Sequence, residues 1–280
     1  MNILSRAFLL RLLWCCITIA CTPASTSALA QTPQEIYRPS EGQPGKDVVW
    51  IPSPEEMVGK MLDMAKVTPK DFVIDLGSGD GRNVIAAAKR GARARGVEFN
   101  PDLVALSTRN AAAAGVADKA QFVEGDMFAA DISRATAMIL FLITDNLRKL
   151  TPKFLDLKPG TRIVSNTFEI TGWTADQTYK LGGDCVVWCT AFLYIVPAKV
   201  AGTWRMPQGE LTLRQDFQMV YGTLNTGDRN LTVENGKLSG NQIRFSAGGA
   251  HYSGRVNGEM MKGSVKSNVK GAWSATRARS

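Results

Sequence analysis

The sequence predicts an α/β protein in which a mainly parallel sheet, with helices on both faces, is followed by a smaller antiparallel β domain. Between residues 50 and 198, short apolar runs alternate with segments of helical period, as in parallel strands joined by crossover helices. From residue 199 onward no helical period occurs, and turn signals separate segments of alternating apolar and polar residues. The length of 280 residues is sufficient for two such domains.

Apolar periodicity predicts the elements of the first domain. Met57, Met61 and Leu62 share one face of a helix, and Pro101 signals the start of another. Residues 31–49, rich in Gln, Pro, Gly and Ser, are expected to form an extended arm. Helices are expected at 55–66, 82–90, 102–114 and 146–155, and strands at 72–76, 94–99, 120–124, 137–143, 161–165 and 186–196.

The second domain, residues 199–280, is expected to be an antiparallel meander that forms a small barrel or sandwich. Apolar and polar residues alternate over 211–221, which predicts one long strand. Asn235-Gly236 and Asn257-Gly258 are two-residue hairpin signals. Further strands are expected at 238–245, 252–256, 260–265 and 272–275.

The basic charge is concentrated in the second domain. The chain carries a formal net charge of +8, yet residues 31–198 hold 19 basic and 20 acidic side chains. Residues 199–280 hold 12 basic and 5 acidic ones. This excess predicts either a solvated basic β surface or contact with an acidic partner or a membrane surface.

Residues 1–30 are typical of a secretory signal peptide. Arg6 and Arg11 precede a short apolar core, and Ala28-Leu-Ala30 supplies a small-x-small cleavage pattern before Gln31. The apolar run is shorter than the roughly 20 residues of a transmembrane helix. We therefore expect an exported protein, periplasmic or secreted, with a membrane-anchored form as the alternative.

Cysteine and histidine usage limits the chemistry. There are five cysteines and one histidine, and three of the cysteines lie in the leader. The two remaining cysteines and the single histidine are too few for a Cys/His zinc cluster, which needs about four ligands, so no metal is expected. On a strand, residues four apart such as Cys185 and Cys189 are about 13 Å apart, which is too far for a disulfide, and a strand is predicted at 186–196. Two buried thiols are expected, with a disulfide only if the chain kinks at Gly182-Gly183.

A glycine-rich turn between a predicted strand and a predicted helix is the most informative stretch. Asp75-Leu-Gly77-Ser78-Gly79-Asp80-Gly81 suits a nucleotide-like ligand at the carboxyl end of a parallel sheet. A dinucleotide site would show G-x-G-x-x-G and would place a pyrophosphate beside carboxylates. At about 4 Å two like charges repel by roughly 4 kcal/mol even at an effective dielectric of about 20. S-adenosylmethionine carries a sulfonium and an ammonium instead, and acidic residues favour it.

Two further acidic residues end the next predicted strands. Glu98 lies 21 residues past Gly77, where an acid accepts hydrogen bonds from both ribose hydroxyls. Asp126 is placed to take the adenine amino group, with Met127 or Phe128 against the ring. The predicted S-adenosylmethionine site consists of Asp75, Gly77, Ser78, Gly79, Asp80, Gly81, Glu98, Phe99, Asp126 and Met127.

Over residues 48–196 the sequence resembles a class I S-adenosylmethionine-dependent methyltransferase. More narrowly, it is similar to the group that includes the mitochondrial lysine methyltransferases of the adenine nucleotide translocase and of the ATP synthase c-ring protein. The resemblance implies a Rossmann-like sheet of seven strands whose last strand, at 186–196, is antiparallel. The matching residues are Trp50-Ile-Pro52-Ser53-Pro54, 75–82, Val97-Glu98, Asp126, Asn146-Leu-Arg148 and 158–165.

The resemblance also implies in-line methyl transfer to a protein side chain, with lysine as the expected acceptor. Solvent can accept the proton of a lysine, so no dedicated base is demanded. The loop after the fourth strand would face the methyl group, which makes Asp145 and Asn146 the candidate catalytic residues, with a helix cap as their alternative role. This loop lacks the Asn/Asp-Pro-Pro-Tyr motif of amino-directed DNA methyltransferases, and no nucleic-acid partner is expected.

Two other functions stay open on the sequence alone. One is methylation of a small molecule or lipid. The other is a non-catalytic protein that binds the cofactor or contacts the envelope.

Overall fold

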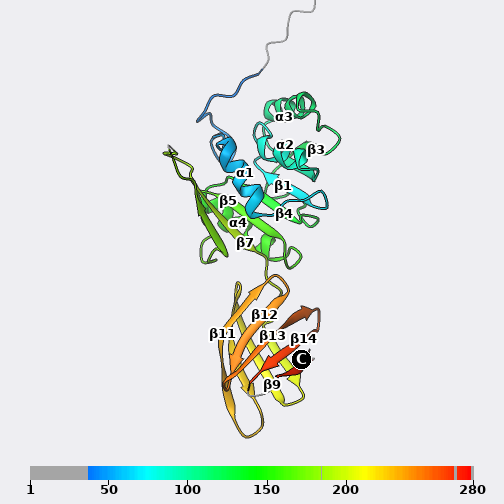
Figure 1. Cartoon of the computed structure of the whole chain (residues 1–280). Helices are drawn as coiled ribbons and strands as arrows, with labels where there is room; N and C mark the ends of the chain where they lie inside the picture. Colours follow the sequence, from blue (N-terminus) through cyan, green and yellow to red (C-terminus); the bar gives the residue numbers. More distant parts are fainter. Residues whose placement is uncertain (1–36, 184, 268–269, 279–280) are drawn as a thin grey trace, which may run out of the picture. The chain divides into compact units, whose positions relative to one another are not determined.

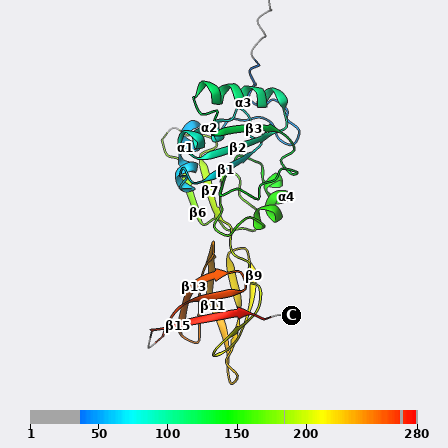
Figure 2. The same ribbon diagram turned by 90° about the vertical axis from the view of Figure 1, so that its right-hand side faces the viewer.

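The chain forms two separate sheets. A computed structural model describes residues 37–183, 185–267 and 270–278, and the predicted leader lies outside them. One sheet has seven strands in the order β3-β2-β1-β4-β5-β7-β6, and the other is a closed antiparallel barrel in the order β10-β11-β12-β13-β14-β15-β8-β9 (Figures 1 and 2). The predicted α/β sheet followed by an antiparallel β domain is confirmed.

In the first sheet, helices join β1 to β2, β2 to β3 and β4 to β5, whereas residues 125–136 join β3 to β4 without a helix. β1 pairs in parallel with β2 and β4, whereas β7 pairs antiparallel with β5, as the resemblance implied. The helices are α1 (Glu55–Met64), α2 (Arg82–Lys89), α3 (Pro101–Ala113) and α4 (Thr144–Leu155). The strands are β1 (Phe72–Leu76), β2 (Arg93–Glu98), β3 (Ala120–Glu124), β4 (Ala137–Leu140), β5 (Arg162–Asn166), β6 (Gln177–Lys180) and β7 (Thr190–Ile195).

Apolar layers hold helices on both faces of this sheet. Successive residues of a strand point to opposite faces, and β1 accordingly gives Val73 to one layer and Ile74 to the other. Met57 of α1 and Val84 of α2 lie with Val73, while Leu147 of α4 lies with Ile74. The glycine-rich turn after β1 is therefore anchored by a strand that is buried on both sides.

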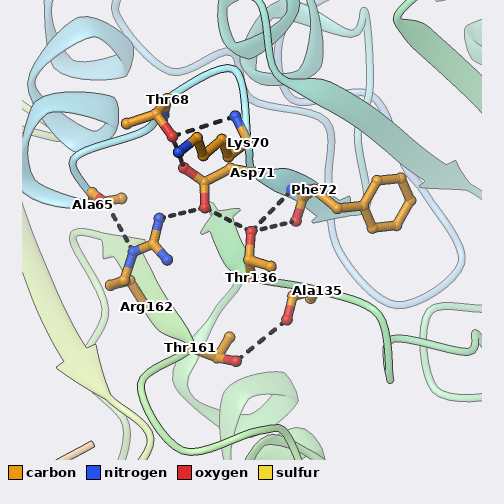
Figure 3. Close-up of polar contacts among 9 residues, drawn as sticks. All are labelled: Ala65, Thr68, Lys70, Asp71, Phe72, Ala135, Thr136, Thr161 and Arg162. Atoms are coloured by element: carbon orange, nitrogen blue, oxygen red, sulfur yellow. Dashed lines mark hydrogen bonds and ion pairs between the residues drawn. The ribbon is translucent and has the colours of Figure 1, made fainter.

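A polar network holds the amino ends of β1, β4 and β5 together (Figure 3). The Asp71 carboxylate accepts hydrogen bonds from the Thr68 amide at 2.8 Å, the Thr136 hydroxyl at 2.7 Å and the Arg162 guanidinium at 2.7 Å. Arg162 also donates from Nε to the carbonyl of Ala65 at 2.9 Å. This network lies at the amino ends of the parallel strands, opposite their carboxyl ends, so it is structural rather than part of the predicted site.

The barrel has an interior of large apolar side chains. Trp204, Leu211, Leu238 and Met261 are buried in it, and the Trp204 indole donates to the carbonyl of Val200 at 2.8 Å. The strands are β8 (Gly202–Met206), β9 (Gly209–Asp216), β10 (Met219–Asn225), β11 (Asn230–Ser239), β12 (Gln242–Ala247), β13 (Ala250–Asn257), β14 (Met260–Lys266) and β15 (Lys270–Arg277).

Three sequence predictions about the strands of the barrel are wrong. The strand expected over 211–221 is a hairpin that turns at Phe217, whose φ is 47°. Asn235-Gly236 lies inside β11, where the register with β10 and β12 shifts, so it forms a bulge rather than a hairpin turn. The strand expected at 238–245 is likewise split between β11 and β12. A hairpin joins β13 to β14 where Asn257-Gly258 predicted one, but its two turn residues are Gly258 and Glu259, because Asn257 still pairs with Met260.

The prediction of two thiols is also wrong. Cys185 and Cys189 form a disulfide, with their Cα atoms 6.0 Å apart. β7 begins at Thr190, so the two cysteines lie before the strand, and Gly183 has a φ of 69° that helps the chain to turn. Among the described residues, no helix is both long and apolar enough to span a membrane.

Candidate active site

A pocket lies at the carboxyl ends of β1, β2, β3 and β4, where the sequence placed the cofactor. Residues 43–53 line it from one side. The predicted cofactor residues that line it are Asp75, Gly77, Ser78, Gly79, Asp80, Glu98, Phe99, Asp126 and Met127. The structure therefore brings the three acidic strand ends together in one pocket.

The glycine-rich turn allows close approach of its neighbours. Gly79 has a φ of 55°, and a Cβ there would lie 2.7 Å from the indole nitrogen of Trp50. Gly81 caps α2 with a φ of 85°, and a Cβ there would lie 2.6 Å from the Phe122 ring. Gly81 does not line the pocket, so its part is to shape the turn rather than to face a ligand.

Asp75 is the most buried acidic residue of the pocket, only 2% exposed. Its Oδ2 accepts a hydrogen bond from Asn83 at 3.1 Å, whereas its Oδ1 has no partner among the residues that the structure describes. Burial raises the pKa of Asp75 well above its ordinary value, and the nearby Glu98 and Asp80 carboxylates add to the increase, against the Asn83 hydrogen bond. A buried carboxyl oxygen without a partner costs free energy, and a cationic ligand would satisfy it.

Glu98 and Asp80 are already engaged with the protein. Glu98 accepts from the amides of Gly79 at 2.9 Å and Asn100 at 3.0 Å, which ties the turn to the end of β2. Each carboxylate oxygen has a second lone pair, so Glu98 can still accept ribose hydroxyls. Asp80 pairs with Arg82 at 2.6 Å, and Arg82 donates to the carbonyl of Ser53 at 2.6 Å.

Asp126 is paired with a residue of the arm. Lys46 donates to its carboxylate at 2.6 Å and lies 4.6 Å above the ring of Phe99. This Lys46 hydrogen bond, with one from the Phe128 amide, lowers the pKa of Asp126. Lys46 thus contacts Asp126, which the sequence assigned to the adenine amino group, and Phe99, another predicted cofactor residue, and it must move if adenine is to use Asp126.

Most of the pocket residues that the sequence did not assign to the cofactor lie in residues 43–53, which include the end of the arm. The described part, residues 37–49, is not extended but doubles back, because the backbone of Trp50 bonds to Gly42 and Gln43 at 2.9 and 3.0 Å. Asn83 and Phe141 also line the pocket without having been predicted. The stretch Trp50–Pro54 was noted as a matching motif, which is the signal that could have placed the arm at the site.

The two candidate catalytic residues do not line this pocket. Asp145 lies in the first turn of α4, its side chain is 72% exposed, and it pairs with Arg148 at 3.4 Å. Asn146 is buried and donates to the carbonyl of Asp47 at 3.3 Å. Asn146 thus holds the arm in place, and the geometry gives Asp145 no contact with the pocket.

The residues present fit S-adenosylmethionine. The pocket gathers carboxylates at three strand ends, and one buried carboxyl oxygen is left for a cationic group. A pyrophosphate in the same place would be repelled. Asp75 would take the ammonium, Glu98 the ribose, and Asp126 with Met127 the adenine end.

Comparison with known proteins agrees with this geometry. The model of the ANTKMT methyltransferase domain family matches residues 75–177. A protein-lysine N-methyltransferase of Saccharolobus islandicus is 42% identical over 152 residues, which are 53% of this chain and 94% of that protein. The mouse adenine nucleotide translocase lysine N-methyltransferase is 33% identical over 141 residues, which are 50% of this chain and 61% of its own length.

A solved structure is also similar. The RNA methyltransferase of Salinibacter ruber, in complex with S-adenosyl-L-homocysteine, is 43% identical and covers 54% of this chain and 96% of its own, with a TM-score of 0.50. Fold, pocket and relatives together define an S-adenosylmethionine-dependent methyltransferase. Because the Saccharolobus relative is matched over nearly its whole length, the chain belongs to the ANTKMT methyltransferase family. It spans about three fifths of the mouse relative.

Proposed function

We propose that this protein transfers a methyl group from S-adenosylmethionine to the ε-amino group of a lysine in a protein substrate. The observation that carries the proposal is the 42% identity to the Saccharolobus protein-lysine N-methyltransferase over 94% of its length. The mouse relative, which by its name acts on lysine of the adenine nucleotide translocase, supports the same acceptor.

The chemistry needs little from the protein beyond positioning. When bound, the cofactor supplies a methyl carbon on a sulfonium. The lysine would first lose its ammonium proton to water, and its neutral nitrogen would then form the new bond to that carbon while the carbon–sulfur bond breaks with its electron pair on sulfur. The pocket's task is to orient the two reactants and exclude competing water, and Asp75, Glu98 and the arm over the pocket serve it.

A labelled-methyl experiment tests this function. The full chain is incubated with tritiated S-adenosylmethionine and with cell fractions, and the proteins are hydrolysed to identify methyllysine. We expect label in methyllysine, strongly reduced by Asp75→Asn. Asp228→Asn, which changes an exposed acid of the barrel, is the matched control and should leave transfer unchanged. Label in RNA, or in small molecules and lipids alone, contradicts the lysine proposal.

We further propose that the protein is exported and that its barrel contacts an anionic envelope surface. Basic residues pair across neighbouring strands: Lys237 with Arg244, Arg255 with Lys262, and Lys266 with Lys270. In a barrel the residues that alternate with the core face outward. These six residues, here called the basic face, therefore share the outside of β11 to β15 and suit anionic headgroups.

Vesicle binding tests the basic face. We expect the full chain to bind phosphatidylglycerol vesicles, more weakly as salt rises, and not phosphatidylcholine vesicles. Changing Arg244, Arg255 and Lys262 to Gln should weaken binding by about 100-fold, since three basic residues at about 1 kcal/mol each contribute about 3 kcal/mol. The same change at Lys89, Arg109 and Lys158, exposed in the first domain, is the control. Equal effects of the two triple variants would exclude a specific role of the basic face.

A further inference from the structure

Three aromatic side chains meet at the edge of the sheet beside the pocket. Phe141 follows β4, Phe168 follows β5, and Trp188 precedes β7. β4, β5 and β7 are neighbours, and the antiparallel direction of β7 brings its first residue to the end of β5. Residues far apart in the sequence thus lie together at the same edge as the acidic pocket.

The rings form a triangle, here called the aromatic trio. The Phe141 and Trp188 centroids are 5.2 Å apart in an edge arrangement, and the Phe168 centroid lies 6.2 Å from each. All three side chains are half-buried, so part of the trio reaches solvent. Phe141 also lines the pocket, which makes the trio continuous with the place where the methyl donor is held.

The trio has the chemistry to bind an alkylammonium group. A cation within about 6 Å of an aromatic ring is attracted to its face, and methylated ammonium groups are bound in proteins by clusters of such rings. A carboxylate partner would also attract the cation, but it would raise the pKa of the amine and keep it protonated. Neutral rings hold the amine without stabilising its proton to the same degree, which suits a nitrogen that must lose a proton before each transfer.

We infer that the aromatic trio is the binding site for the acceptor amine, the ε-amino group of lysine and of its partly methylated forms. This inference rests on the proposed function. It adds the residues that select the acceptor, and it leaves cofactor binding to the acidic pocket.

The disulfide serves as a positioning device for Trp188. Cys185 and Cys189 are bonded, and Trp188 lies between them with a φ of 60°. The left-handed region is unfavourable for a residue other than glycine, so the surrounding chain must hold Trp188 there. Opening the disulfide releases this restraint, and we expect the trio to bind an amine more weakly in the reduced protein.

The test is a binding titration that does not require catalysis. The full, oxidised chain with S-adenosyl-L-homocysteine is titrated with a trimethyllysine peptide and with the same peptide carrying an uncharged tert-butyl isostere. We expect about 5- to 30-fold tighter binding of the cation, in the range of cation–π attraction. Trp188→Leu and Phe168→Leu should abolish this preference, and Trp188→Phe should keep most of it. Tyr221→Leu, at an exposed aromatic residue of the barrel, is the matched control.

Other outcomes overturn the inference. The inference is wrong if the protein binds the two peptides with equal affinity or binds neither of them. It is also wrong if both Leu variants keep the preference for the cation. A parallel loss of S-adenosyl-L-homocysteine affinity in folded Trp188→Leu protein would assign the ring to the cofactor instead. The labelled-methyl experiment judges the proposed function separately, because it identifies methyllysine whether or not the trio selects the amine.

Reduction tests the positioning role. Dithiothreitol should lower the cation preference of the natural protein and have no further effect on a Cys185→Ser/Cys189→Ser variant, which starts at the reduced level. An equal preference in oxidised, reduced and double-variant protein would remove the disulfide from the account of Trp188.

Discussion

At the scale of single residues, Asp75 combines burial with an unsatisfied acceptor. Its neighbours provide one hydrogen bond, from Asn83, and two like charges, Glu98 and Asp80. Such a residue costs stability in the ligand-free protein and gains a partner when a cation binds. Stability and binding are therefore expected to respond in opposite directions when its charge is removed.

The first prediction concerns Asp75→Asn. Asparagine keeps the shape but not the charge, so S-adenosylmethionine should bind about 10- to 100-fold more weakly, since a hydrogen bond to a charged group contributes about 1.5–3 kcal/mol. The melting temperature should stay the same or rise, because a buried charge is gone. Isothermal titration and calorimetric melting measure the two effects. A large fall in melting temperature would show that Asp75 supports the fold rather than the ligand.

The second prediction is the pH dependence of cofactor binding. The pKa of Asp75 is raised by burial, and the ammonium of the cofactor favours its ionised form. Binding therefore releases a proton whenever Asp75 is protonated beforehand, and affinity should rise with pH until it passes the raised pKa. Titrations at several pH values should show this rise continuing above the ordinary range of a carboxyl group and levelling off only when the raised pKa has been passed. Asp75→Asn should flatten the profile, and a profile that both proteins share would point to another group.

At the scale of elements, the network around Asp71 joins three strand ends (Figure 3). Asp71 is 8% exposed, and burial alone would raise its pKa. Hydrogen bonds from Arg162, Thr136 and Thr68 outweigh burial and lower the pKa below its ordinary value. The ionised carboxylate therefore stabilises the folded state.

The third prediction is the cost of removing this carboxylate. Asp71→Asn removes the charged partner of Arg162, whose side chain is only partly exposed to water. The free energy of unfolding should therefore fall by about 2–4 kcal/mol. The pKa of Asp71 is lower in the folded than in the unfolded protein. Its contribution to stability is therefore complete at pH values above the unfolded pKa, and it is lost as the pH falls through the folded pKa. Urea unfolding followed by helical circular dichroism reports on the first domain. Asp118→Asn, at a largely exposed acid, is the control and should change stability by less than about 0.5 kcal/mol.

Local chemistry explains which elements the sequence could predict. The strand, glycine turn and helix around Asp75 follow from burial, positive φ and capping within a dozen residues, and all formed as expected. Asn235-Gly236 failed because pairing with β10 and β12 overrode the turn preference of the dipeptide. The Lys46–Asp126 pair joins residues 80 apart, and no local pattern predicts such a contact.

The disulfide between Cys185 and Cys189 is another contact that the sequence pattern did not predict. The expectation of two thiols assumed that residues 186–189 were part of a strand, whose repeat would hold the two cysteines too far apart. The chain instead turns before Thr190 and brings their Cα atoms to 6.0 Å. A strand over these residues would have kept the two cysteines apart, but β7 begins at Thr190 and leaves both of them before it.

At the scale of the whole molecule, the disulfide and the predicted leader both indicate the same kind of cellular compartment. Disulfides persist in oxidising environments outside the cytoplasm, and a signal peptide directs a chain there. The two features are independent, since one lies before residue 31 and the other joins Cys185 to Cys189. Their agreement supports export as a proposal that can be tested on the native protein.

The fourth prediction follows from export. Mass spectrometry of protein isolated from its native cell envelope should find an N-terminus at Gln31, and thiol labelling before and after reduction should find Cys185 and Cys189 joined. Protein expressed in the cytoplasm without residues 1–30 should carry both thiols free until it is oxidised. An intact N-terminus with free thiols in the native protein would place it in a reducing compartment. In that case the disulfide could not hold Trp188 in the cell, and acceptor selection would have to rest on Phe141 and Phe168.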